Sequence, residues 1–114
     1  MYNIFMSNCR GGTIMDENLK NILIDAMGSN LSTLRSRLSL SQEELAELLG
    51  VTRQTISSFE NGQRKMTWSV FLALILIFFR NEPTKRLLVA FNIYTPELNN
   101  FLIVSNKNNK EKGA

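Results

Sequence analysis

The chain of 114 residues contains no histidine and a single cysteine, Cys9. A His-based catalytic triad, a zinc site with histidine ligands and an intrachain disulfide are therefore excluded. One cysteine gives no reason to place the chain in an oxidising compartment, so we expect a cytoplasmic protein. The acidic residues form no positioned acid–base set, and we expect neither an enzyme nor a bound cofactor or metal ion.

Long apolar runs are also scarce. The longest covers residues 70–79 and ends at Arg80, whereas a helix needs roughly 20 apolar residues to span a bilayer. No membrane partner is expected. A composition of 44% hydrophobic and 20% charged residues suits one compact domain. The net charge of +3 permits a nucleic-acid partner without requiring one.

The two ends of the chain differ from its middle. Residues 1–14 lack periodicity, and the sequence from Arg10 to Met15 can be encoded by a purine-rich ribosome-binding site followed by a start codon. They are either a disordered leader or an extension preceding the true start at Met15. Residues 105–114 are polar and predict a disordered tail. A single all-α domain is therefore expected over residues 15–104.

Apolar spacing predicts helices through the first half of this domain. A helix beginning near Asp16 is expected to end at residues 28–30, where Gly28, Ser29 and Asn30 are poor helix formers. Its inward stripe consists of Leu19, Ile22, Leu23 and Ala26. A second helix follows, with its inward stripe at Leu31, Leu34 and Leu38.

Capping residues delimit two further short helices. Ser41 and Glu44 form a capping box that begins one helix, and Gly50 is suited to end it. Thr52 is an N-cap for the next helix, which covers residues 53–60. The first of these helices is expected to bury Leu45, Leu48 and Leu49.

The residues around this turn resemble a known family. The segments 40–46, 50–57 and 59–62 closely match the running pattern of the phage-repressor and Cro-like helix-turn-helix family, also called the xenobiotic-response-element family. The resemblance covers about residues 29–65. It implies a compact all-α bundle of about five to seven short helices, like the lambda-repressor DNA-binding domain. The helix-turn-helix core is expected at residues 29–80, followed by extra C-terminal helices.

Helix 53–60 is the expected recognition helix. Ile56 and Phe59 are expected to point inward, which leaves an outer face without a carboxylate. In the major groove, Arg can bond guanine, Gln can bond adenine and Thr can contact the thymine methyl group. We therefore expect Arg53, Gln54 and Thr55 to contact bases, and the resemblance assigns the same role to Ser58.

Phosphate contacts are expected on both sides of this helix. Gln42 can hold a phosphate with its amide and the free N–H groups of a helix N-terminus, as its counterpart does in the family. The other expected phosphate contacts are Ser57, Asn61, Arg64 and Lys65. Residues 35–65 contain five Lys or Arg against four Glu, a net charge of only +1. Two copies on half-sites about one helical turn apart would raise the affinity.

The resemblance also implies a structural ion pair. Family members link the first helix to the recognition helix by a largely buried arginine–glutamate pair, which corresponds here to Arg35 and Glu60. The alternative is that the two residues are independent surface charges. Removing one partner of a buried pair costs roughly 3–5 kcal/mol.

The C-terminal third suggests a subunit interface. Residues 68–79 are apolar on every face of a helix, which must then be covered on every face. Further helices are expected from Pro83 and over residues 95–104. A second copy of the chain is the expected cover, and a plain monomer core is the alternative.

Two functions agree with these patterns. The first is a dimeric, sequence-specific regulator of transcription that binds double-stranded DNA as a repressor and is located at the nucleoid when bound. The second is an antitoxin-type interaction protein, which binds a protein partner through its C-terminal apolar surface and autoregulates through the same helix-turn-helix. Complex formation with the product of a neighbouring gene would separate them.

Overall fold

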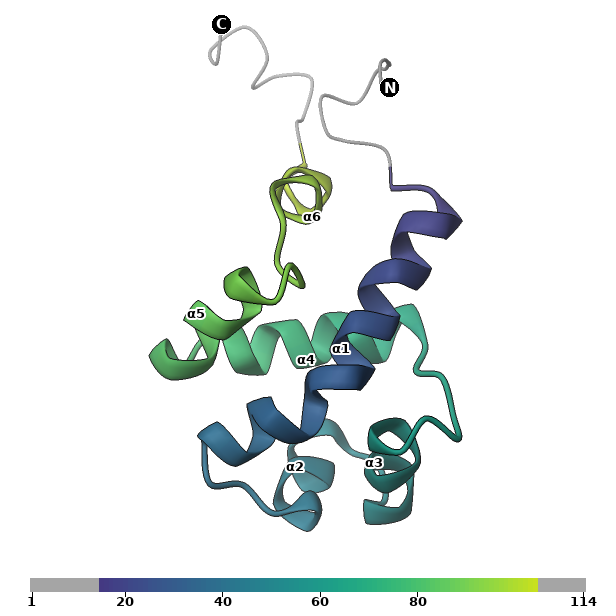
Figure 1. Cartoon of the computed structure of the whole chain (residues 1–114), viewed down its shortest axis with the longest axis vertical. Helices are drawn as coiled ribbons and strands as arrows, with labels where there is room; N and C mark the ends of the chain where they lie inside the picture. Colours follow the sequence, from purple (N-terminus) through teal and green to yellow (C-terminus); the bar gives the residue numbers. More distant parts are fainter. Residues whose placement is uncertain (1–14, 105–114) are drawn as a thin grey trace, which may run out of the picture.

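The computed structural model describes residues 15–104, which form six α-helices and, within that range, no β-strand. Figure 1 shows α1 lying across α4, with α2 and α3 on one side of this pair and α5 and α6 on the other. The predicted all-α fold is confirmed, whereas the predicted leader and tail lie outside the described residues. The helices are α1 (Glu17–Arg37), α2 (Gln42–Leu49), α3 (Arg53–Glu60), α4 (Trp68–Phe79), α5 (Glu82–Ala90) and α6 (Pro96–Leu102).

The first two predicted helices are one continuous helix. The break expected at residues 28–30 is wrong, because the buried stripe continues through them. A Cβ atom at Gly28 would lie 3.7 Å from the carbonyl oxygen of Phe59, so α3 packs closely against this point. A glycine inside a helix costs about 1 kcal/mol relative to alanine, which is less than the gain from burying several large side chains. These side chains are Leu23, Met27, Leu31 and Leu34.

The predicted caps of the helix-turn-helix are present. The Ser41 hydroxyl accepts a hydrogen bond from the Glu44 backbone N–H at 3.0 Å, and the Glu44 carboxylate accepts one from the Ser41 N–H at 2.8 Å. Gly50 ends α2 with a φ of 78°, a left-handed conformation that glycine adopts without steric cost. Thr52 caps α3 through the N–H of Thr55. Local chemistry therefore sets both helix starts and the turn between them.

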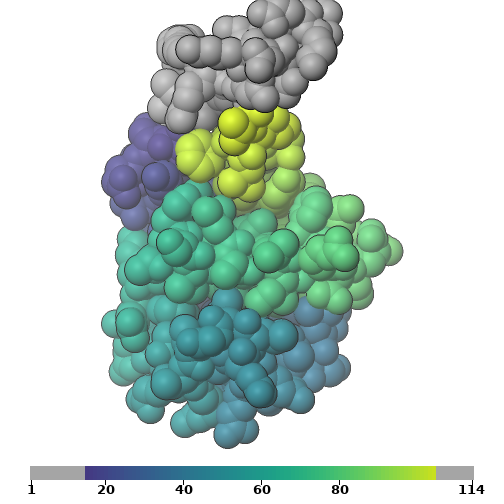
Figure 2. Space-filling model, turned by 180° about the vertical axis from the view of Figure 1, so that it is seen from behind, coloured from purple at the N-terminus to yellow at the C-terminus, as the bar shows by residue number. Residues whose placement is uncertain are grey.

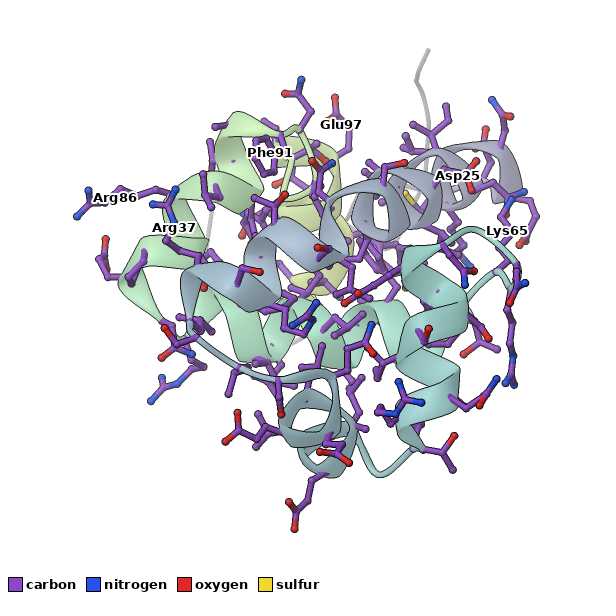
Figure 3. The ribbon with its side chains drawn as sticks, turned by 60° about the horizontal axis from the view of Figure 1, so that its bottom comes forward. Asp25, Arg37, Lys65, Arg86, Phe91 and Glu97 are labelled. Carbon is purple, nitrogen blue, oxygen red and sulfur yellow. The ribbon has the colours of Figure 1, made fainter. Side chains whose placement is uncertain are left out.

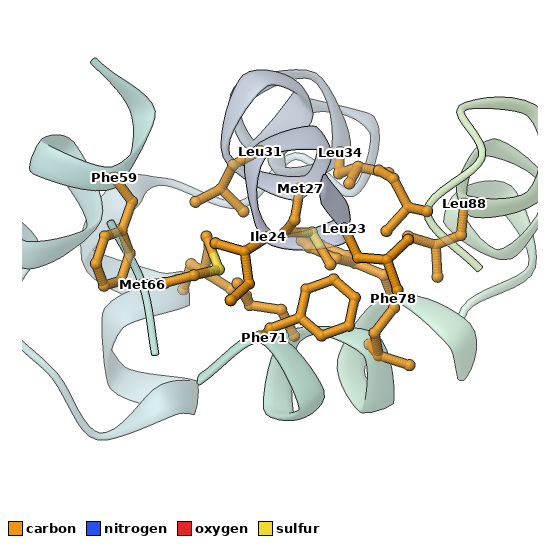
Figure 4. Packing of buried hydrophobic residues seen from close by; sticks show 14 of the residues in the cluster. Leu23, Ile24, Met27, Leu31, Leu34, Phe59, Met66, Phe71, Phe78 and Leu88 are labelled. Carbon is orange, nitrogen blue, oxygen red and sulfur yellow. The ribbon is translucent and has the colours of Figure 1, made fainter. Parts of the chain in front are cut away.

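The core forms between α1 and α4. In Figure 4, Leu23 and Met27 of α1 face Phe71 and Phe78 of α4, and Leu88 of α5 closes one side. Four residues of α4 are buried, and most of its other apolar residues are partly buried. The chain's own helices thus cover most of α4, so its apolar composition does not by itself require a second subunit. The homodimer stays a prediction.

Two residues expected in the core lie on the surface instead. Ile22 is 54% exposed and Leu48 is 60% exposed. Ile22 faces away from the stripe that contains Met27, and Leu48 lies on the side of α2 opposite to the buried Ala46. None of the helices within residues 15–104 is long and apolar enough to cross a membrane.

Candidate nucleic-acid interface

Helix α3, the expected recognition helix, has one buried and one open face. Ile56 and Phe59 are buried against the body, as expected. Arg53 and Gln54, in the first turn, are exposed. The other three residues expected on or beside the outer face are only half-exposed, so the most accessible part of α3 is its N-terminal turn. These three are Thr55, Ser57 and Ser58.

A chain of hydrogen bonds links this exposed turn to the interior. Arg53 Nη1 donates to Gln42 Oε1 at 3.1 Å. Gln42 Nε2 in turn donates to Glu60 Oε1 at 2.9 Å. Both ends of the Gln42 amide are therefore used inside the protein. The Gln42 side chain thus connects the Arg53 guanidinium to Glu60, a link that the sequence pattern did not indicate.

The next link in this chain is an ion pair. Arg35 in the last turn of α1 donates to both carboxylate oxygens of Glu60, from Nε at 2.7 Å and from Nη2 at 3.2 Å. The side chains of Arg35 and Glu60 are 16% and 9% exposed. Arg35 Nη1 also donates to the Leu40 carbonyl at 2.9 Å, so one guanidinium connects α1, α3 and the loop before α2. The two residues are thus not independent surface charges.

The segment after α3 has a fixed course. Asn61 Oδ1 accepts a hydrogen bond from the Gln63 N–H at 2.9 Å, and Gly62 has a φ of 81°. The Arg64 N–H donates to the Ser58 carbonyl at 3.2 Å, and its guanidinium lies 5.8 Å from the centre of the Phe59 ring. The expected phosphate-binding residues of this segment, Asn61, Arg64 and Lys65, are all exposed.

Lys65 has a partner that sequence analysis missed. Its Nζ lies 3.3 Å from Oδ1 of Asp25 in α1, and Figure 3 shows the two side chains next to each other. A cleft of about 410 Å³ is lined by residues of α1, of the end of α3 and of the following segment, and both residues belong to its lining. The two positions are far apart in the sequence, and no local pattern pairs them.

No group of three or more His, Cys, Asp or Glu side chains that could hold a metal ion occurs within residues 15–104. The acidic residues near α3 have other roles. Glu44 caps α2 through the Ser41 N–H, and Glu60 is held by Arg35 and Gln42. The outer face of α3 therefore remains free of carboxylates.

Comparison with known proteins gives the same class of domain. Residues 26–77 match the sequence model of a family described as a helix-turn-helix domain. The chain is also similar to the uncharacterized HTH-type transcriptional regulator YgzD of Bacillus subtilis, with 47% identity over 36 residues. These residues make up 32% of this chain and 54% of YgzD, so the match spans about half of that relative. No solved structure matches the chain. The chain thus contains a helix-turn-helix domain.

Proposed function

We propose that this chain is a sequence-specific DNA-binding regulator of transcription, of the phage-repressor and Cro-like type, with α3 inserted in the major groove. One observation carries the proposal: Arg53 and Gln54 project from the first turn of a helix whose opposite side is buried. The N-terminal residues of a recognition helix are the ones that contact base edges in this class of motif. The similarity to YgzD, which is named a transcriptional regulator, supports the same role.

The exposed groups match the chemistry of the groove. Within residues 15–104 only the Nη1 group of Arg53 is hydrogen-bonded, to Gln42, and guanine offers two acceptors to such a guanidinium. The Gln54 amide can pair with adenine in the same two-point manner. The hydroxyl of Thr55 bonds that of Thr52, so its methyl group is the part suited to a thymine. Ser58 is half-exposed and would reach a base only at close approach.

Backbone contacts would fix the domain on the duplex. We assign these to the N-terminus of α2 at Gln42 and to the end of α3 and the segment after it. Because the Gln42 amide already bonds Arg53 and Glu60, and the Glu44 N–H already bonds Ser41, the backbone N–H groups of Gln42 and Glu43 are the better phosphate donors there. The remaining proposed phosphate contacts are Ser57, Asn61, Arg64 and Lys65.

We further propose that the regulator acts as a homodimeric repressor that occupies promoter DNA. One domain offers few backbone contacts, and a second copy on an adjacent half-site doubles them. The C-terminal third leaves several apolar side chains exposed that a second copy could cover: Leu76, Val89, Leu102, Ile103 and Val104.

The same exposed side chains support one second candidate, an antitoxin-type protein that binds a protein partner through this region. Light scattering on the purified chain, alone and with the product of the neighbouring gene, separates the two. A mass of two chains supports the homodimer. A stable complex with the added protein favours the antitoxin-type role instead.

The decisive test of DNA reading uses Arg53→Ala. Genomic sites bound by the tagged protein are mapped first, and affinities are then measured on the cognate duplex and on a random one. Loss of a two-point contact to guanine should cost about 1–3 kcal/mol on the cognate duplex and much less on the random one. Lys65→Ala is the matched control, since loss of a phosphate contact weakens both complexes similarly. Equal losses from Arg53→Ala on both duplexes would refute base contact.

A further inference from the structure

The ion pair between Lys65 and Asp25 lies at the edge of the proposed DNA interface. Its two charged atoms are 3.3 Å apart, and the side chains of Lys65 and Asp25 remain 53% and 66% exposed. The pair therefore joins a proposed phosphate-binding lysine to a carboxylate on α1.

The two partners differ in how freely they can move. Asp25 is fixed on α1, whose neighbouring residue Ile24 is buried in the core. Lys65 lies in the segment after α3, and among residues 15–104 its ammonium group pairs with the Asp25 carboxylate alone. Rotation about the bonds of a lysine side chain can move the ammonium group over several ångströms while the backbone stays in place. Lys65 can thus leave Asp25 for another anion beside the same segment.

We propose that Asp25 competes with the DNA backbone for Lys65 and so lowers the affinity of the helix-turn-helix for DNA of any sequence. This inference rests on the function proposed above. A lysine that neutralises a phosphate releases a counterion from DNA, which is the main source of sequence-independent affinity. A lysine already paired with Asp25 gains less from this exchange, and the carboxylate that it leaves behind repels the phosphate.

The consequence is that contacts to bases supply a larger share of the binding free energy than they would without Asp25. Contacts to bases by Arg53 and Gln54 are unaffected by Asp25, whereas the backbone contribution is reduced. Binding to random DNA, which depends on the backbone contribution alone, is then weakened to a level at which base contacts decide where the protein stays. Asp25 is in this sense an affinity-determining residue and makes no DNA contact of its own.

The test is Asp25→Asn in the full-length chain. Binding to a fluorescent random duplex, about two helical turns long, is followed by anisotropy over a series of salt concentrations. Because an exposed ion pair is worth up to about 1 kcal/mol, we expect roughly two- to fivefold tighter binding at low salt. The plot of log affinity against log salt should also become steeper, by up to about 0.9, as one more phosphate is neutralised.

Two controls distinguish the effect of the Lys65–Asp25 pair from the effect of a change in net charge alone. Glu17→Gln makes the same charge change on the same helix at an exposed position in its first turn, and it should leave affinity and salt slope nearly unchanged. In a Lys65→Gln background, the gain from Asp25→Asn should shrink, because the competed lysine is gone. Equal thermal unfolding midpoints of the variants would show that folding is not the cause.

Three results would overturn the inference. They are an unchanged affinity in Asp25→Asn, a gain equal to that of Glu17→Gln, and a weaker affinity, which would mean that the pair positions the segment for binding. Each requires that the wild-type chain binds DNA, so each leaves the proposed function intact. A wild-type chain that binds neither duplex, or Arg53→Ala with unchanged sequence discrimination, would reject the proposed function and this inference with it.

Discussion

Helices α3 and α4 of this chain are built on opposite principles. α3 has two buried apolar residues and a polar remainder, so only one of its sides can face the core. α4 consists of apolar residues except for Ser69, so every side could face the core. The structure buries Phe71, Leu74, Ile75 and Phe78 and leaves Leu76 66% exposed. A sparse apolar pattern therefore specifies the orientation of a helix better than a continuous one does.

The two helices also differ in the kind of surface that they expose. The exposed face of α3 is polar and is supported from beneath by hydrogen bonds through Gln42 and Glu60. Part of α4 reaches the surface in the view from behind (Figure 2), and Leu76 is among its exposed residues. A polar, supported face suits the donors and acceptors of a nucleic acid, whereas an exposed leucine suits an apolar partner.

The largest expected change in the free energy of unfolding comes from an alanine substitution on the buried side of α4, compared with one on its exposed side. Phe78 is fully buried, so Phe78→Ala should lower the free energy of unfolding by about 3–5 kcal/mol. Leu76→Ala on the exposed side should change it by less than about 0.5 kcal/mol. Urea denaturation measures both. Phe78→Leu, which keeps most of the volume, is the milder variant if the alanine form does not fold.

Protein concentration sharpens this comparison. If Leu76 lies in a homodimer interface, the loss caused by Leu76→Ala should grow as the protein is concentrated, because association stabilises the folded state. The loss from Phe78→Ala should not depend on concentration in this way. Equal losses at the two positions in dilute solution would contradict the assignment of the buried side of α4.

The next largest change in stability is expected from breaking the ion pair between Arg35 and Glu60. Glu60→Ala leaves the guanidinium of Arg35 without its carboxylate partner in a site where the arginine side chain is only 16% exposed. We expect a loss of about 3 kcal/mol in the free energy of unfolding, measured in urea. Glu47→Ala removes an exposed carboxylate from α2 and should cost less than about 0.5 kcal/mol. A loss below about 1 kcal/mol for Glu60→Ala would place the pair among ordinary surface ion pairs.

Features that depend on neighbouring residues were predictable from the sequence. The capping box of Ser41 and Glu44, the left-handed turn at Gly50 and the buried side of α3 each follow from a few adjacent positions. These features place Arg53 on the outside of the molecule, so the exposed turn of the candidate interface was also predictable. The resemblance to a known family contributed the arginine–glutamate pair.

Features that depend on distant residues were not predictable. Gly28 looked like a helix end, but packing against α3 and the continuous buried stripe keep α1 helical there. The partners of Gln42 and of Lys65 come from other helices, and nothing adjacent to either residue in the sequence indicates them. Tertiary contacts outweigh a local preference of about 1 kcal/mol, which is why local patterns fail at such positions.

The smallest expected effect tests whether Gln42 acts through Arg53. If Gln42 orients the guanidinium by accepting its hydrogen bond, the two residues should be coupled in binding the cognate duplex. A cycle of Gln42→Ala, Arg53→Ala and the double variant should then give an interaction energy of about 0.5–1.5 kcal/mol. Affinities from anisotropy on the cognate duplex supply the four values.

The control cycle pairs Arg53→Ala with Lys65→Ala, two residues between which no hydrogen bond or ion pair is found in the described part of the chain. Their losses should add to within about 0.5 kcal/mol. If the losses from Gln42→Ala and Arg53→Ala also add, Gln42 binds the backbone independently, and its amide must leave Arg53 when DNA arrives. Coupling in the first cycle and additivity in the second would instead mean that the Arg53 guanidinium is held in place before binding, which lowers the entropic cost of forming the complex.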